Sequence, residues 1–216
     1  MVKARGEDQS AARPYHHGNL RQALIEAALA LAQQNGPERV SVREAARHLG
    51  VSPAAPFRHF PNRRALMTAV AEEAGERLLI EVRKALAREK GDALARLRAV
   101  GRGYLKWAQR HPAHFRIISA RDQIDIEGST ALRHNIQAVR ELTEQALRAA
   151  QDSGQISTRH EAPALALLAR ATVYGLVRMQ LDGHFGQWEI TPAAAPAAME
   201  ATLDLLIALL QEPSRP

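Results

Sequence analysis

The sequence contains no cysteine among its 216 residues, so it can form neither a disulfide bond nor a thiolate metal site, and it has no catalytic thiol. Long apolar runs are also absent, because no stretch approaches the roughly twenty residues that span a membrane. The polar N-terminal segment lacks the hydrophobic centre of a signal peptide. These absences predict a soluble protein of the reducing cytoplasm with no membrane partner.

Clustered acids, bases and metal ligands are missing as well. The histidines are scattered, and no pair of acidic residues recurs at a metal-ligating spacing. His16 and His17 are adjacent but have no further ligand nearby, and Pro112 disfavours a shared helical face for His111 and His114. We therefore expect no catalytic residue, no metal and no cofactor, which leaves an all-helical enzyme as the weakest functional alternative.

Basic residues, by contrast, are concentrated near the N-terminal end. Residues 1–66 contain ten Lys and Arg against five Asp and Glu, a net charge of +5 out of the +6 of the whole chain. Such a region attracts polyanions, with an affinity that depends on salt through counterion release. Its first part, residues 1–18, is polar without an apolar period, which predicts a disordered basic arm within reach of DNA.

Two short helices around a tight turn are predicted within this basic region. Ser41 at the N-cap with Glu44 three residues later forms a capping box, and Gly50 is a left-handed stop. The first helix should therefore span about 42–49, with one apolar face and one solvated face.

The second short helix begins almost at once. Ser52 is an N-cap, and Pro53 at the first helical position has no N–H to leave unsatisfied, so this helix should span 53–59. Phe57 and Phe60 should anchor it on the domain core. The residues left to face outward are Ala54, Ala55, Arg58 and His59. The two helices together are a helix-turn-helix, which indicates DNA binding.

The same segment carries a dense pattern of residues at fixed spacings. The pattern consists of Ser41, Ala46, Gly50, Val51, Ser52, His59, Phe60 and Leu66. It resembles the DNA-binding domain of the TetR/AcrR family of bacterial one-component regulators. Arg63 stands where that family usually has lysine, Phe57 replaces the usual tyrosine, and Pro56 replaces leucine or isoleucine. We expect these changes to alter base readout but not the fold.

This resemblance implies an all-α protein of about nine helices. The N-terminal helix-turn-helix DNA-binding domain should occupy residues 19–66, opened by a helix capped at Asn19, and the helical ligand-binding and dimerisation domain should occupy 67–216. Breaks in the apolar pattern delimit the later helices. Their predicted spans are 62–88, 92–110, a short helix opened by Pro112, 130–151, 162–182 and 192–211, with Pro196 delaying the start of the last one.

The resemblance also implies which residues would touch DNA. The predicted phosphate contacts are Ser41, Ser52, His59 and Arg63. Ala54 and Ala55 would touch thymine methyl groups, and Arg58 is the candidate for guanine. Arg43 and Phe57 complete the predicted DNA-binding set.

By the same resemblance, the last two helices would form a four-helix dimer interface with their symmetry mates. The similarity is weaker here, because the segment 168–183 keeps only Gly175 and Leu176 of a subgroup pattern. The predicted interface residues are Leu165, Leu168, Thr172, Gly175, Met179, Met199, Leu203, Leu206 and Leu210. The alternative is that these apolar stripes pack inside the monomer.

Aromatic residues make up only 4% of the chain, and six of the nine lie in the helical domain. Aromatic walls with occasional polar tips suit a small-molecule pocket. The predicted ligand-binding residues are Tyr104, Trp107, Phe115, Tyr174 and Met179. The alternative is that these residues are ordinary core.

The sequence thus predicts a DNA-binding transcriptional regulator. The specific hypothesis is a homodimeric repressor that a small-molecule inducer releases from a palindromic double-stranded operator. A non-specific architectural DNA-binding protein is the main alternative, and activation in place of repression stays open.

Overall fold

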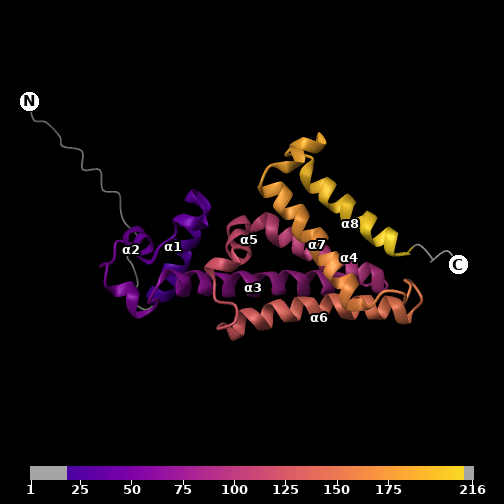
Figure 1. Ribbon diagram of the computed structural model, residues 1–216, viewed down its shortest axis with the longest axis horizontal. Coiled ribbons are helices and arrows are strands. Elements are labelled where there is room, and N and C mark those ends of the chain that lie inside the picture. Colours follow the sequence, from indigo (N-terminus) through magenta and orange to yellow (C-terminus); the bar gives the residue numbers. More distant parts are fainter. Residues whose placement is uncertain (1–18, 212–216) are drawn as a thin grey trace, which may run out of the picture.

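A computed structural model describes residues 19–211, so the predicted basic arm at 1–18 lies outside the described residues. The described part is all-helical, with eight α-helices, four short 3-10 segments and no strand, which confirms the predicted fold class (Figure 1). The α-helices are α1 (Leu20–Asn35), α2 (Val42–His48), α3 (Arg63–Arg88), α4 (Ala93–Arg110), α5 (Pro112–Ser119), α6 (Thr130–Asp152), α7 (Ala162–Leu181) and α8 (Ala195–Gln211). The 3-10 segments are η2 (Pro37–Arg39), η3 (Ala55–Arg58), η4 (Arg121–Gln123) and η5 (His184–Trp188).

Helix α3 runs without a break from the N-terminal domain into the helical body (Figure 1). It begins where predicted, because the Asn62 side chain accepts a hydrogen bond from the Ala65 amide at 2.9 Å. Its first turns place Leu66 and Val70 in the core of the N-terminal domain, whereas Val82, further along, is buried in the core of the body. One helix therefore contributes to two hydrophobic cores.

The caps of the N-terminal domain are formed by the expected residues. The Asn19 and Ser41 side chains accept hydrogen bonds from the Gln22 and Glu44 amides at 3.2 and 3.1 Å. The reciprocal half of the capping box predicted at Ser41 and Glu44 is missing among the described residues. The Glu44 carboxylate instead pairs with Arg47 one turn later, where a charged partner outcompetes the backbone amide.

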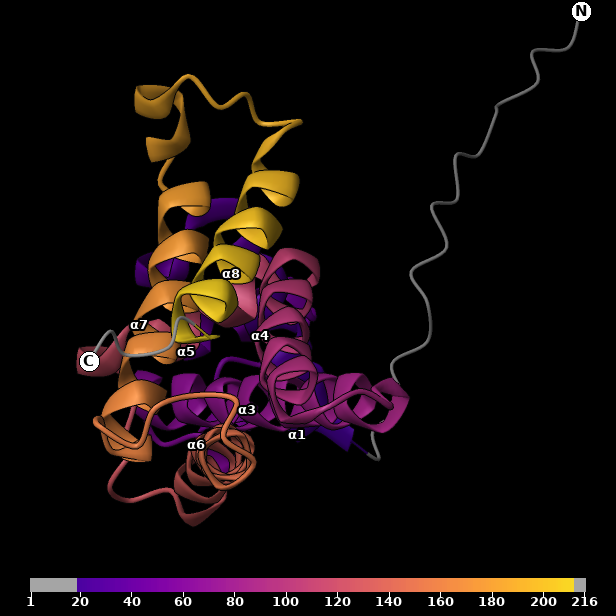
Figure 2. The same cartoon turned by 90° about the vertical axis from the view of Figure 1, so that its right-hand side faces the viewer.

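The body is built around α3 and α4, which pack closely along their length. A methyl group added at Gly103 would come within 2.9 Å of the Val82 Cα atom, so glycine allows the two backbones to approach each other. Helix α6 lies alongside α3, and α7 and α8 form a pair against α4 (Figure 2). Helix α8 starts at Ala195 and not at Pro192, which agrees with the delay predicted from Pro196.

Helix α7 differs from the expectation that no apolar stretch approaches membrane length. Within the described residues it is the one helix long and apolar enough to cross a membrane, with a mean hydropathy of 1.2, and only 28% of its most apolar 18-residue stretch is buried. It nevertheless packs against α4, α6 and α8, and it carries Arg170 and Arg178. Its Leu167 and Leu168 are exposed, and no residue of the described range 19–211 covers them.

His114 on α5 is a buried histidine with an imidazole Nε2 that has no hydrogen-bond partner within the described residues. Burial lowers its pKa to about 4, the positive charge of Arg77 acts in the same direction, and Glu73, 3.8 Å from the imidazole, opposes them. The pKa of the neighbouring His111 is also lowered, chiefly by burial. The folded protein therefore holds His114 in its neutral form.

We predict that acid destabilises the fold first through His114. An unfolded histidine has a pKa of about 6.5, so the unfolded chain binds more protons than the folded one from about pH 6.5 down to about pH 4. The free energy of unfolding should fall as the pH is lowered through this window. When the free energy of unfolding is measured in urea at several pH values, it should depend less on pH between about pH 6.5 and about pH 5 in His114→Gln than in the parent protein. The exposed His160→Gln should keep the full dependence, and equal slopes in both variants would contradict the assignment.

Candidate DNA-binding surface and ligand cavity

The second element of the helix-turn-helix is shorter than predicted. The expected α-helix over 53–59 is wrong, because the structure has only the 3-10 segment η3, Ala55–Arg58. Pro53 and Pro56 each lack an amide hydrogen, and a proline at 56 disfavours the α conformation at Ala55. A 3-10 turn tolerates this pair because it needs fewer amide donors over its short length.

The 3-10 turn also changes which side chain anchors the segment. Phe57 was expected in the core, but its side chain is 40% exposed, so that expectation is wrong. Pro56 is buried in its place, and Phe60, as predicted, is 2% exposed. The tighter rotation per residue turns position 57 outward and position 56 inward.

Most of the predicted DNA-binding residues are exposed and belong to α2, to the turn after it or to η3 and its end. The exposed members are Arg43, Ser52, Ala54, Phe57, Arg58 and His59. Ala55 and Ser41 are half-buried, and the Ser41 hydroxyl is already used in capping α2. Their contacts with DNA remain predictions.

Arg63 is the exception, because its guanidinium binds the protein itself. Its Nε donates to the Val40 carbonyl, and its Nη2 donates to the Pro37 carbonyl and the Gln123 Oε1, each at 2.7 Å. The side chain thus joins the η2 region of the N-terminal domain to η4 of the body. Sequence reasoning missed this role because no local pattern links positions 63 and 123.

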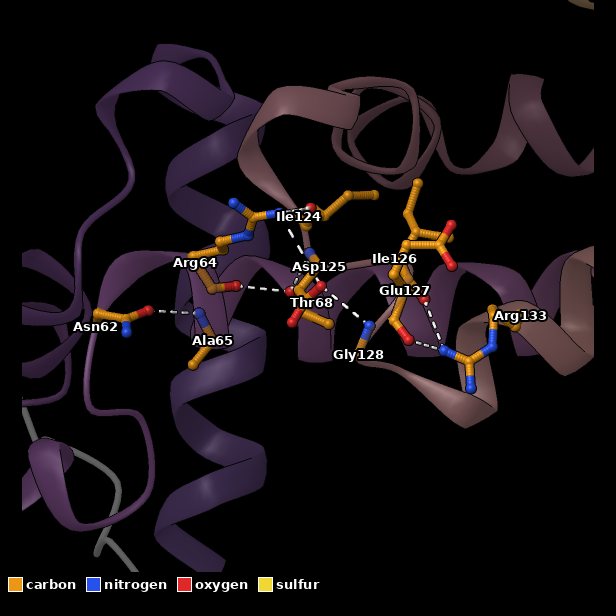
Figure 3. A network of polar contacts seen from close by, with 10 residues as sticks. All are labelled: Asn62, Arg64, Ala65, Thr68, Ile124, Asp125, Ile126, Glu127, Gly128 and Arg133. Atoms are coloured by element: carbon orange, nitrogen blue, oxygen red, sulfur yellow. Dashed lines mark hydrogen bonds and ion pairs between the residues drawn. The ribbon is translucent and has the colours of Figure 1, made fainter.

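The segment 120–129, which we call the hinge loop, is bonded to the start of α3 at further points (Figure 3). Arg64 donates to the Ile124 carbonyl at 3.1 Å, and the Asp125 amide donates to the Thr68 hydroxyl at 2.8 Å. Thr68 in turn donates to the Arg64 carbonyl at 2.8 Å. The first turns of α3 and the hinge loop are therefore one hydrogen-bonded unit.

A cavity of about 580 Å³ lies in the body, between α3, α4, α6 and α7 and the end of α5. This size is within the range of small-molecule sites. Tyr104, Trp107 and Tyr174 line it, where ligand contacts were predicted for them. Phe115 and Met179 do not line it. Phe115 is fully buried behind the wall, with its ring centre 5.4 Å from that of Tyr174, and Met179 packs against the core of the body.

Three arginines that sequence reasoning missed also line the cavity: Arg121, Arg140 and Arg170. The Arg170 guanidinium lies over the Tyr104 and Tyr174 rings, 4.7 and 5.0 Å from their centres, and donates a hydrogen bond to the Tyr104 hydroxyl. Burial raises the pKa of Tyr104, and the positive charges of Arg170 and Arg121 oppose the rise. The one available sequence signal was the spacing of Arg170 and Tyr174, which puts both on one face of a helix.

The predicted dimer residues divide between the two interpretations that the sequence left open. Leu165, Met199 and Leu203 are buried within the described chain, at 9%, 0% and 2% exposure, as the intramolecular alternative expects. Leu168 is 49% exposed, as an interface residue would be in a single chain. The half-buried members are Thr172, Gly175, Met179, Leu206 and Leu210. Three further leucines are exposed on the same two helices, namely Leu167, Leu205 and Leu209.

Together, the fold and these two sites define a helix-turn-helix protein with a separate, cavity-bearing helical domain. Residues 97–211 match the family described as Tetracyclin repressor-like, C-terminal domain, and residues 24–70 match Bacterial regulatory proteins, tetR family. The chain therefore belongs to the TetR family of DNA-binding transcriptional regulators.

Similar proteins were found both by sequence and by structure. The nucleoid occlusion factor SlmA of Vibrio cholerae is 32% identical over 102 residues, which are 47% of this chain and 52% of SlmA. The chain thus matches about half the length of these curated relatives. A protein of unknown function from a Rhodococcus species has a TM-score of 0.76 at 28% identity, covering 93% of this chain and 100% of that one. The TetR-family regulator PfmR from Thermus thermophilus has a TM-score of 0.69 at 20% identity, covering 91% and 98%.

We predict that Thr68→Val weakens the attachment of the hinge loop. The variant keeps the shape of the side chain but removes both hydrogen bonds of the hydroxyl and leaves the Asp125 amide without its acceptor. The free energy of unfolding, measured in urea, should fall by about 1–3 kcal/mol. Thr158→Val is the control, because Thr158 is exposed in the loop between α6 and α7, away from the hinge loop and from the proposed dimer face. A loss no larger than that of the control would show that the bonds at Thr68 contribute nothing.

Proposed function

We propose that the protein is a homodimeric repressor of the cytoplasm that leaves a palindromic operator when a small organic molecule fills the cavity. The observation that carries this proposal is the continuity between the cavity and the hinge loop. Ser119 and Arg121 line the cavity, and Gln123, two residues further, holds Arg63 at the start of α3. A ligand that moves Arg121 would therefore act on residues bonded to the DNA-binding domain.

The proposed DNA contacts follow from the exposed residues of α2, η3 and the turn between them. Arg58 is the candidate for guanine, because a guanidinium can bond two acceptors on the base edge. Ala54 and Ala55 would lie against thymine methyl groups. The phosphate contacts remain those proposed from the family pattern, at Ser41, Ser52, His59 and Arg63. In this arrangement phosphates position the domain and Arg58 supplies most of the base preference.

Dimerisation is supported by the uncovered leucines of α7 and α8. Leu167, Leu168, Leu205 and Leu209 are 49–70% exposed, which is costly for side chains of this size in water. Pairing of α7 and α8 with a second copy would cover them. A two-fold dimer also presents two helix-turn-helix elements to half-sites about 34–36 Å apart, which is what a palindromic operator requires.

Release by a ligand needs no more than a difference in affinity. If the ligand binds a form whose two DNA-binding domains are out of register with the half-sites, it lowers operator affinity by the ratio of its affinities for the two forms. Couplings of this kind are typically about 1–3 kcal/mol. The cavity also argues against a purely architectural DNA-binding role, which has no need of a ligand-sized space.

The first test is selection from a pool of random duplexes at about 0.15 M salt, where non-specific attraction is reduced. We expect a two-fold symmetric motif that is bound by two copies of the chain. Salt-sensitive binding without any enriched motif would contradict the proposal and favour the architectural alternative.

We predict that Arg58→Ala relaxes the base preference. Its affinity for the selected operator should fall by about 1–3 kcal/mol, while its affinity for random duplex should change little. Arg159→Ala removes the same charge from an exposed loop of the body and should change neither. Fluorescence anisotropy with operator and scrambled duplexes measures both quantities. Equal losses of affinity for the two duplexes would contradict the prediction and indicate that Arg58 contacts a phosphate and not a base.

A further inference from the structure

The wall of the cavity is cationic and contains no acidic side chain. Arg121 comes from η4, Arg140 from α6 and Arg170 from α7, while none of the residues lining the cavity is Asp or Glu. Three separate elements thus bring positive charge to one space.

The three arginines differ in how far their charges are neutralised. Arg140 donates to Glu144 at 2.6 Å, and Glu144 also pairs with Arg148 at 2.5 Å. Arg121 and Arg170 form no ion pair with any residue in 19–211. The cavity therefore carries two positive charges that no carboxylate of the described chain offsets.

Arg170 is also held in position. Its guanidinium is stacked over Tyr104 and Tyr174 and bonded to the Tyr104 hydroxyl, which restrains a side chain that is otherwise flexible. A fixed guanidinium with unused N–H groups matches the oxygen pairs of a carboxylate or a phosphate. Arg121 lines the same cavity from η4, directly after the end of α5.

The rest of the wall is mostly apolar, with two unsatisfied polar groups. Leu78, Ile118, Ile136 and Val139 supply aliphatic surface beside the aromatic rings. The Trp107 indole N–H and the Ser119 hydroxyl belong to lining residues, and both are buried without a hydrogen-bond partner in the described chain. Buried donors without partners are costly, so an acceptor brought by a ligand would be favourable.

We propose that the cavity binds an organic anion: a carboxylate or phosphate head on Arg170 and Arg121, with an apolar, ring-sized or chain-like body against the aliphatic and aromatic wall. This proposal rests on the cavity being the regulatory site proposed above, and it names the class of inducer. Neutral and cationic molecules of the same shape are disfavoured, because they leave two positive charges of the wall without a counter-charge.

The test uses full-length protein and probes that differ only in their head groups. Phenylbutyrate and phenyloctanoate are compared with the phosphate monoesters, alcohols and amines of the same chain lengths. Trp188→Phe is the background, because Trp188 is 68% exposed and its loss leaves Trp107 in the cavity wall as the only indole. Binding is followed by the fluorescence of Trp107 and by calorimetry.

We expect at least one of the anionic probes to bind, and its alcohol and amine counterparts to bind about tenfold more weakly or not at all. The relative affinities of carboxylate and phosphate then identify which head group the arginines prefer. Arg121→Gln and Arg170→Gln should each lower the affinity for the anionic probe by about tenfold and leave the affinity for the alcohol unchanged. Arg159→Gln, with the same change of charge outside the cavity, should bind the anion as the parent does.

Two results would overturn the proposal: equal affinity for the anion and the alcohol of one chain length, or no binding of any anionic probe. Operator binding by the unliganded protein is measured separately. A protein that binds anions at Arg121 and Arg170 without any effect on operator binding would keep this inference and refute the regulatory function. A protein that binds an operator but prefers neutral probes would refute this inference and keep the proposed DNA-binding function.

Discussion

Helix α3 is the element on which the rest of the structure depends, because its two ends are buried in different hydrophobic cores. Leu66 and Val70 are fully buried in the N-terminal domain, and Ala74 and Val82 are fully buried in the body. Close-packed interiors resist small displacements, so neither end of this helix can shift without repacking a core. The orientation of the DNA-binding domain is therefore set by where α3 lies in the body.

The hinge loop gives this orientation a second support. Its bonds to Arg63, Arg64 and Thr68 join the body to α3 at its first turns, on the side of the N-terminal domain. These bonds are polar and part-buried, which makes them easier to exchange than the apolar contacts of α3 with either core. A change in the cavity wall would therefore act on the DNA-binding domain more readily through the hinge loop than through a rearrangement of packed side chains.

The sequence predicted what local rules determine. The caps at Asn19 and Ser41 are contacts within four residues, and each was found where the pattern placed it. The prediction of an α-helix over 53–59 was wrong because two prolines within four residues outweighed a favourable N-cap. The segment 55–58 is too short to show an apolar period, so the sequence did not indicate whether position 56 or 57 would face the core.

For the cavity, the sequence predicted the aromatic lining residues but not the arginines, and the reason is a different one. Aromatic residues were chosen because they suit ligand sites, and Tyr104, Trp107 and Tyr174 do line the cavity. The three arginines were not found, because each looks like an ordinary solvated residue on its own helix. Their convergence depends on how α6, α7 and η4 are placed around the cavity, which arises from packing over long sequence separations.

Arg63 can keep its hydrogen bonds within the chain and still make the proposed contact with a DNA phosphate. A guanidinium has five N–H donors, and the bonds to Val40, Pro37 and Gln123 use Nε and Nη2 only. The two donors on Nη1 remain for a phosphate, so the proposed DNA contact does not require the bonds within the chain to break. A phosphate held there would hydrogen-bond the same guanidinium that binds Gln123 of the hinge loop. DNA and the hinge loop would then stabilise one orientation of Arg63 together, and a ligand that displaced the hinge loop would weaken DNA binding at this residue directly.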